Sequence, residues 1–281
     1  MLSRVSESGP HAPGRLPATE HTEATLIEAA LPRRWTELQD GVGQILRECG
    51  LEVRINYPLT LARGTVNVDV HAYDGTTSPA STTIVECKLW RKRVPKQAVH
   101  GFRTVVSDAG ANVGLLVSAA GFQRGAMDAV EHTNVQLVDW TQFQELYTLR
   151  WFRMFFAPTL RRESDALLEY TEPINTRIFR KADRLPPEKQ TQFRRLRETY
   201  ADLGRAFILL LHQLPDSPGI PDLRDLPVLP SLPLRRLFRT VEPRLPDDVL
   251  DATALRTLLD LLIGHFRAAT ADFDAVFGER A

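Results

Sequence analysis

The chain has 281 residues, 43% of them hydrophobic and 25% charged, and its formal net charge is zero. This composition is typical of a globular protein with one large or two modest domains. It excludes a protein that coats nucleic acid through bulk charge, so a nucleic-acid partner would have to be held by local basic patches. We expect no membrane segment, because no apolar run approaches the length of a span. Two cysteines, Cys49 and Cys87, suit the reducing cytoplasm and argue against a disulfide scaffold or a cysteine-built zinc site.

The N-terminal half predicts helices alternating with strands. Residues 1–22 have no apolar signal core and are expected to form a disordered tail. Apolar residues at helical spacing then predict a helix that Gly50 ends, followed by a strand over 51–58. Strict alternation over 64–75 predicts a second strand. We expect it to place Val66, Val68, Val70 and Ala72 on one face and Asn67, Asp69 and His71 on the other.

A loose turn over 74–81 leads into a third strand that ends near Trp90, so the second and third strands are expected to form a hairpin. The remaining elements are a helix at 95–110, a strand at 112–118, a helix at 121–134 and a strand at 135–140. The order α-β-β-β-α-β-α-β predicts an α/β domain over residues 23–148 with a mixed sheet flanked by helices.

Residues 149–281 have a different character and predict a helical C-terminal region. One apolar stripe runs from Phe193 to Leu214 in alternating three- and four-residue steps, and another lies in a helix at 252–277. Between them, residues 214–246 form a proline-rich linker. The two stripes could pack on each other within one chain or build the seam of a homodimer, and the sequence leaves both arrangements open.

The stretch IVECKLW, residues 84–90, carries an acid and an amine two positions apart. Since side chains alternate along a strand, Glu86 and Lys88 point to the same side. The preceding strand can bring Asp69 beside them, which would place two carboxylates and one ammonium in one cleft. The residues on the two sides of this strand are Ile84, Glu86, Lys88 and Trp90 on one, and Val85, Cys87 and Leu89 on the other.

This set suits the hydrolysis of a phosphodiester. Mg²⁺ takes oxygen ligands, commonly one or two carboxylates completed by water and substrate phosphate. Asp69 and Glu86 can supply the carboxylates, and the backbone carbonyl of Cys87 lies between side chains that face the cleft. The metal would acidify the attacking water and neutralise charge on the phosphate. Lys88 could orient that water or accept its proton, and the sequence leaves both roles open.

Asp69, a hairpin turn and Glu86-Cys87-Lys88 resemble the Asp…(Asp/Glu)-x-Lys signature of the restriction-endonuclease-like, or PD-(D/E)xK, nuclease superfamily. The surrounding segments, GTVNVDVHA, VGLLVSAAGFQRGAMDAVEHTNVQLVDW and ELQDGVGQILRECGLEV, are similar to the Mrr-type restriction endonuclease domain. The resemblance spans roughly residues 33–148. It implies a mixed sheet flanked by helices, dependence on Mg²⁺ or Mn²⁺, and cleavage of DNA, with Asp69, Glu86 and Lys88 at the catalytic positions.

The family often places a glutamate on the first helix near the metal. Here Gln39 falls in that register, with Glu37 two residues earlier. Gln97 resembles a glutamine of related nucleases, and His71 shares the predicted face of Asp69, although a structural histidine is the alternative. These four residues are candidates to support the site. The basic stretch after the site supplies candidate DNA contacts at Arg91, Lys92, Arg93 and Lys96.

The sequence therefore favours a cytoplasmic, Mg²⁺-dependent endonuclease that cuts DNA in defence against foreign DNA, with a homodimer through the C-terminal helices. Three alternatives stay open: a nuclease of DNA repair or junction processing, a nuclease fold that binds nucleic acid or a partner without cutting, and an assembly protein dominated by its helices.

Overall fold

The computed structural model of the chain describes residues 25–61, 64–211, 229–236 and 244–278. The tail expected over 1–22 lies outside these ranges, as does most of the proline-rich segment 214–246. The described piece of that segment contains a short 3₁₀ turn, Leu234–Arg236, whose Leu234 is buried. This piece therefore packs on the core.

Five strands form one mixed sheet in the order of the chain. The first two pairings, β1–β2 and β2–β3, are antiparallel, and the last two, β3–β4 and β4–β5, are parallel. This arrangement confirms the predicted α/β domain with a mixed sheet. The strands are β1 (Glu52–Leu61), β2 (Gly64–Asp74), β3 (Ser81–Lys88), β4 (Val113–Ser118) and β5 (Val135–Val138).

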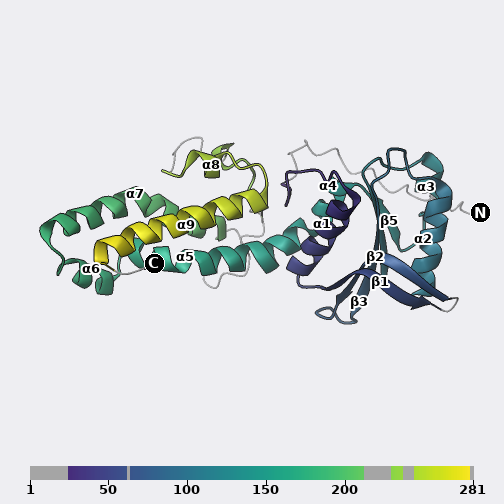
Figure 1. Cartoon of the computed structure of the whole chain (residues 1–281), viewed down its shortest axis with the longest axis horizontal. Coiled ribbons are helices and arrows are strands. Elements are labelled where there is room, and N and C mark those ends of the chain that lie inside the picture. The colour runs from purple at the N-terminus through teal and green to yellow at the C-terminus, as the bar shows by residue number, and fades with distance from the viewer. Residues whose placement is uncertain (1–24, 62–63, 212–228, 237–243, 279–281) are drawn as a thin grey trace, which may run out of the picture.

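Helices cover both faces of this sheet, as Figure 1 shows. On one face lie α1 (Trp35–Glu48) and α4 (Trp140–Trp151), and on the other lie α2 (Lys96–Asp108) and α3 (Arg124–Asp128). The helix predicted over 121–134 is confined to the five residues of α3, and turns complete the connection.

The apolar side chains of β3 alternate between two cores, as its sequence predicts. Val85 and Cys87 pack with α1 and α4 in a large core, whereas Ile84 packs with α2 and α3 in a smaller one. Both faces of the strand are therefore buried over Ile84, Val85 and Cys87, whereas Glu86 and Lys88 stay partly exposed.

The prediction that Val66, Val68, Val70 and Ala72 of β2 share one face is wrong. Val70 packs in the large core, but Val68 packs in the small one. Between them the ladder with β1 passes from Ile55–Val70 to Tyr57–Val68 without a pair at position 56. Asn56 there has a left-handed backbone (φ 51°), which asparagine tolerates better than most residues. The irregular step changes which core the following side chains enter.

The predicted helical C-terminal region is confirmed, but it is not separated from the sheet by a linker. Helix α4 runs on through a π-helical turn (Phe152–Phe156) into α5 (Ala157–Thr171), so the boundary expected at 148 falls inside a continuous helix. Figure 1 shows this helix as the arm that leads from the sheet to the bundle. The bundle also contains α6 (Thr176–Ala182), α7 (Pro187–Leu211), α8 (Asp247–Leu250) and α9 (Leu255–Phe277).

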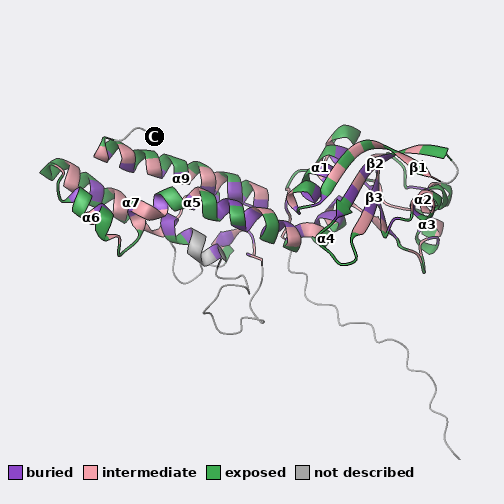
Figure 2. Cartoon of the chain, turned by 90° about the horizontal axis from the view of Figure 1, so that it is seen from below, coloured by how far each residue is buried: buried purple, intermediate pink, exposed green. Residues whose placement is uncertain are grey.

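The apolar stripes of α7 and α9 pack on each other within the chain. The ring of Phe193 meets that of Phe273 edge-on at 5.8 Å, and Tyr200 lies 6.1 Å from the same ring. Of the two arrangements left open by the sequence, the structure therefore shows packing in cis. The buried residues face the interior of the bundle in Figure 2, so these stripes are not free to form a dimer seam.

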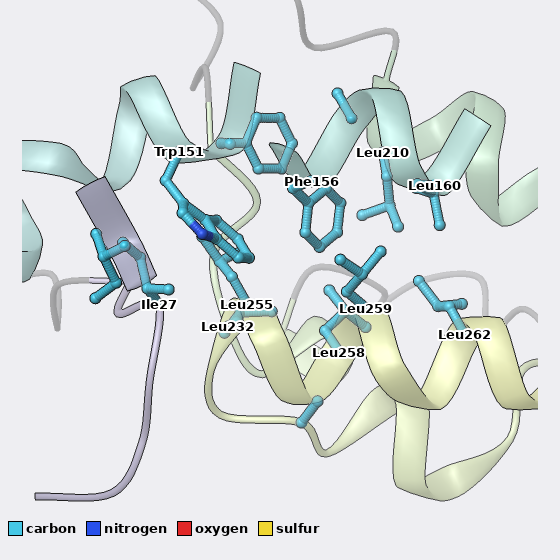
Figure 3. Close-up of a cluster of buried hydrophobic side chains, with 14 of the residues drawn as sticks. Ile27, Trp151, Phe156, Leu160, Leu210, Leu232, Leu255, Leu258, Leu259 and Leu262 are labelled. Atoms are coloured by element: carbon cyan, nitrogen blue, oxygen red, sulfur yellow. The ribbon is translucent and has the colours of Figure 1, made fainter. Parts of the chain in front are cut away.

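One continuous apolar core joins the bundle to the sheet (Figure 3). Trp151 and Phe156 of the connecting helix meet Leu255 and Leu259 of α9, and Ile27 enters from the segment before α1. That segment also forms a parallel β-bridge from Leu26 to Ala254. A bilayer span needs about 20 mostly apolar residues, and no helix in the described ranges meets that requirement.

Candidate active site

The site forms where β2 separates from β3. Ladder pairing between the two strands reaches Val70–Val85 and goes no further towards the end of β3. Beyond it, the side chain of Asp69 takes the place of the ladder, because its Oδ2 accepts a hydrogen bond from the backbone nitrogen of Cys87 at 2.7 Å. Residues 18 positions apart are thereby held in contact, and Asp69 lies beside Glu86-Cys87-Lys88 as the sequence predicts.

Glu86 and Lys88 form an ion pair on the strand that carries them. Both side chains are about one-fifth exposed to solvent. The backbone beneath them is fixed by β4, since Glu86 pairs with Leu116, and Lys88 pairs with Ser118. The acid and the amine thus project from a strand held firmly on one side and open on the other.

The surroundings of Asp69 disfavour its ionised form. The pKa of Asp69 is raised to about 6, mainly by burial and also by the negative charge of Glu86, against the opposing effects of the Cys87 amide and the Lys88 ammonium. A nearby cation would favour the ionised form of Asp69 and so lower this raised pKa.

Cys87 takes part in the site through its backbone amide and carbonyl, and its thiol does not face the site. Burial raises the pKa of the thiol well above the ordinary value, and the side chain lies in the large core. Its carbonyl oxygen instead accepts a hydrogen bond from the indole Nε1 of Trp35, at 3.1 Å. Trp35 begins α1, and no sequence pattern places it at the site. Its helical spacing suggested only a core residue, although its side chain is 40% exposed.

The donor set fits a hard divalent cation. Mg²⁺ needs only one or two protein carboxylates when water and a phosphate complete its shell. Asp69, Glu86 and the Cys87 carbonyl are oxygen donors gathered at one strand end. In the described part of the chain, no group of three or more His, Cys, Asp or Glu side chains converges, so the fit rests on these two carboxylates and one main-chain oxygen.

Of the four residues predicted to support the site, the structure brings Gln39 to it. Its amide is buried, and it donates to the backbone oxygen of Asp69 at 3.0 Å and to Asn56 Oδ1 at 2.9 Å. Gln39 therefore links the irregular step of β1 to the strand that carries Asp69. It contacts the backbone of Asp69 rather than its carboxylate.

The other three lie elsewhere. Glu37 closes the N-terminus of α1, where its carboxylate accepts from Arg33 and Arg34. The ring of His71 lies 5.1 Å from that of Tyr57, tilted by 50°, and burial lowers the pKa of His71, as for a structural histidine. Gln97 is exposed on the first turn of α2.

A family comparison agrees with this geometry. Residues 33–147 match the model of the restriction endonuclease family, Mrr catalytic domain. The match identifies an Mrr-type restriction endonuclease domain over these residues. The match covers about two-fifths of the chain and includes every site residue described above, and it implies DNA nuclease activity.

Solved structures similar to the chain include two restriction enzymes. The protein of unknown function AF1548 is 13% identical with a TM-score of 0.33, over 86% of this chain and 98% of its own. MspJI in complex with a 27-mer oligonucleotide is 20% identical (TM-score 0.26, 42% of this chain, 27% of that one). The modification-dependent AspBHI is 16% identical (TM-score 0.25, 44% and 39%). The chain thus spans less than half of either restriction enzyme, and no curated protein sequence matches it.

A basic surface follows the site in the Mrr-type domain. Trp90, just beyond β3, is 45% exposed, and the Lys88 Nζ lies 5.3 Å from the centre of its ring. The four cationic residues predicted to contact DNA all have exposed side chains between the end of β3 and the first turn of α2. They are Arg91, Lys92, Arg93 and Lys96.

Proposed function

We propose that the Mrr-type domain hydrolyses DNA phosphodiester bonds with the help of Mg²⁺ or Mn²⁺. The observation that carries this proposal is the placement of the Asp69 carboxylate on the Cys87 amide, at the point where β2 leaves β3 and next to the Glu86–Lys88 pair. It gathers two carboxylates and an ammonium at one accessible strand end. A protein that only binds DNA has no need for clustered carboxylates beside phosphates, because like charges repel.

The proposed ligands are the carboxylates of Asp69 and Glu86 and the carbonyl oxygen of Cys87. A bound divalent cation supplies a polarised water and charge neutralisation on the phosphate. The Cys87 amide holds one Asp69 oxygen in place and leaves the other free to bind. Glu86 is fixed through the β4 pairing of its backbone.

Lys88 is proposed to act on the attacking water, either by orienting it or by accepting its proton. Its ammonium lies between the Glu86 carboxylate and the face of Trp90, so it is positioned at the mouth of the site. A lysine suits this role better than an arginine, because its compact amine can bind one oxygen atom and can lose a proton.

The four exposed cations over residues 91–96 are proposed to bind the DNA backbone beside the cut. Phosphate contacts of this kind position a protein without reading sequence. We propose that the protein acts in the reducing cytoplasm, where the thiols of Cys49 and Cys87, which are buried and form no disulfide, would stay reduced. Defence against foreign DNA is the proposed setting, by analogy with the restriction endonucleases of the family, with repair or junction processing as the alternative.

Cleavage of both strands of a duplex requires two sites, and we therefore propose a homodimer that uses the helical region. Since the inner stripes of α7 and α9 are buried in cis, the contact would use outward faces of the helices. Light scattering on the full-length chain tests this point: the mass of a single chain at micromolar concentration, with or without DNA, contradicts it.

The decisive experiment compares wild type with Glu86→Gln and Lys88→Ala on supercoiled plasmid and linear DNA, in Mg²⁺, Mn²⁺ or EDTA. We expect nicking and linearisation by the wild type in either metal, none in EDTA, and a loss of at least about 100-fold in both variants. Equal cutting by all three proteins would show that the site is wrong. If none of them cuts but all bind DNA, the binding-module alternative gains.

A further inference from the structure

Two tryptophans present exposed faces beside the candidate site. Trp35 is 40% exposed and Trp90 is 45% exposed, although indoles are mostly buried in folded proteins. Neither is loose: the Trp35 Nε1 is bound to the Cys87 carbonyl, and the Trp90 ring lies under the Lys88 ammonium. Two consecutive residues of the site, Cys87 and Lys88, thus each hold one indole at the edge of the site.

A small apolar pocket opens at the same end of the sheet. It has a volume of about 250 Å³, and its walls are mostly apolar, with Leu31, Leu38, Leu89 and Trp140, but also include Asp139. Leu89 directly precedes Trp90 in the chain, and Leu31, which is 69% exposed, lies four residues before Trp35. Pockets for drug-sized ligands measure roughly 300–1,000 Å³, so this one suits a single ring system.

The surroundings point to a nucleic-acid occupant. Exposed aromatic faces next to a cationic stretch are the combination by which proteins hold unpaired nucleotides: the cations bind the phosphates, and the rings stack on the bases. The four cations at 91–96 supply the first part, and the two indoles supply the second. An apolar protein segment would match the rings but would leave these charges unused.

We propose that Trp35 and Trp90 stack on unpaired bases next to the scissile phosphate, and that the nearby apolar pocket receives the ring of one such base. The substrate class is therefore DNA whose bases are unpaired, or easily unpaired, at the cut. This inference rests on the proposed nuclease function, which places the scissile phosphate at Glu86 and Lys88. In an intact duplex the base faces are hidden by stacking, and exposing one has a free-energy cost. Single-stranded DNA avoids that cost.

The test measures binding without cleavage. In EDTA, intrinsic tryptophan fluorescence and DNA anisotropy are followed for three equally long probes: an oligo(dT) strand, a perfect duplex and a duplex with a central mismatched bubble. We expect the strand and the bubble to bind more tightly than the perfect duplex and to quench the tryptophan emission. Trp35→Ala and Trp90→Ala should each weaken binding to oligo(dT) by roughly 5- to 100-fold.

Two further variants separate stacking from structural effects. Trp35→Phe keeps an aromatic face but loses the hydrogen bond to Cys87, so it should retain most of the affinity. Tyr73→Ala removes a comparably exposed ring (39%) near the other end of β2 and should leave binding unchanged. Trp90 lies beyond the end of β3, so Trp90→Ala is expected to fold. It can therefore be measured even if Trp35→Ala does not fold.

Three results would overturn the proposal. The first is equal affinity for oligo(dT) and the perfect duplex. The second is unchanged binding in both alanine variants, or equal losses in Trp35→Phe and Trp35→Ala. The third is a change of molecular mass in the variants with unchanged DNA binding, which would assign the surface to a second copy of the chain. Glu86→Gln should retain the preference for unpaired DNA, so failure of the nuclease proposal and failure of this one remain distinguishable.

Discussion

The carboxylate of Asp69 and the backbone amide of Cys87 are joined by a hydrogen bond of 2.7 Å at the point where the β2–β3 ladder stops. This bond takes over a position that a strand–strand hydrogen bond would otherwise fill. It therefore fixes Asp69 relative to Glu86 more firmly than two unconstrained side chains would allow. The same carboxyl group also carries a pKa raised to about 6, mainly because it is buried.

The first prediction concerns this carboxylate. Asp69→Asn retains an oxygen that can accept from Cys87 but removes the charge that we propose holds the cation. DNA cleavage should fall at least about 100-fold, while the free energy of unfolding should change by no more than about 1 kcal/mol. Plasmid nicking and denaturant unfolding measure the two effects. Asp40→Asn, an exposed acid on α1, is the matched control. Full activity in Asp69→Asn would remove Asp69 from the proposed site.

The second prediction concerns metal binding without DNA. A ligand that binds only the folded state stabilises it by about 2.7 kcal/mol at 100 times its Kd. Millimolar Mn²⁺ or Mg²⁺ should therefore raise the melting temperature of the wild type, and EDTA should reverse the rise. The shift should vanish in Asp69→Asn and persist in Asp40→Asn. An equal shift in both variants would place the cation elsewhere on the molecule.

The third prediction concerns acid stability. A hydrogen bond from Arg150 holds the pKa of the buried Asp74 well below its ordinary value near 3.8. A depressed folded-state pKa stabilises the protein above the unfolded pKa, and the contribution is lost as pH falls through about 4 and below. Asp74→Asn should therefore be less stable than wild type by about 1–3 kcal/mol at pH 7. The gap should narrow below pH 4 in unfolding curves, and a constant gap from pH 7 to 3 would contradict the assignment.

The fourth prediction concerns the junction between sheet and bundle. Arg256 of α9 pairs with Glu28 and Glu48, and Glu48 also accepts from the indole of Trp151 at 2.6 Å. Only 17% of the Arg256 side chain and 12% of that of Glu48 are exposed. Burial opposes ionisation of Glu48, but the bonds from Arg256 and its neighbours outweigh it and lower the pKa.

Removing Arg256 leaves a poorly hydrated carboxylate without its cation, so Arg256→Ala should cost up to about 3 kcal/mol of unfolding free energy. Arg267, another arginine of α9, is 71% exposed and pairs with Glu163 of α5, and Arg267→Ala should cost at most about 1 kcal/mol. Chemical denaturation of both variants measures the difference. Equal losses would show that the junction does not depend on the buried network.

The fifth prediction compares Gly101, which lies in α2, with Gly114 of β4, which packs against α2. A Cβ on Gly114 of β4 would lie 2.5 Å from Val106 Cγ2 and 3.1 Å from Phe102, so Gly114→Ala should destabilise the domain by about 1–3 kcal/mol. Gly101, inside α2, has open space around it, and Gly101→Ala should stabilise the domain by up to about 1 kcal/mol. Thermal melts of the two variants should shift in opposite directions. Shifts of the same sign would mean that the helix does not pack on β4 as described.

Local patterns in the sequence are enough to predict much of this protein. The alternation of residues 84–90 places Glu86 and Lys88 on one side of a strand, because the period of a strand is two wherever the backbone is regular. The spacing of apolar residues likewise predicts α1, α2, α7 and α9, since each must bury one stripe. The resemblance to the Mrr-type domain rests on the same local segments.

Tertiary structure decided the features that depend on contacts between distant segments. Trp35 reaches Cys87 across 52 positions, and Gln39 reaches Asp69 across 30. No local period encodes either contact, because both follow from how α1 docks on the sheet. The irregular step at Asn56, which sends Val68 and Val70 into different cores, is invisible in a strictly alternating sequence. The same holds for the unbroken helix through residue 148, because packing of Trp151 and Phe156 against α9 fixes that junction and local propensity does not.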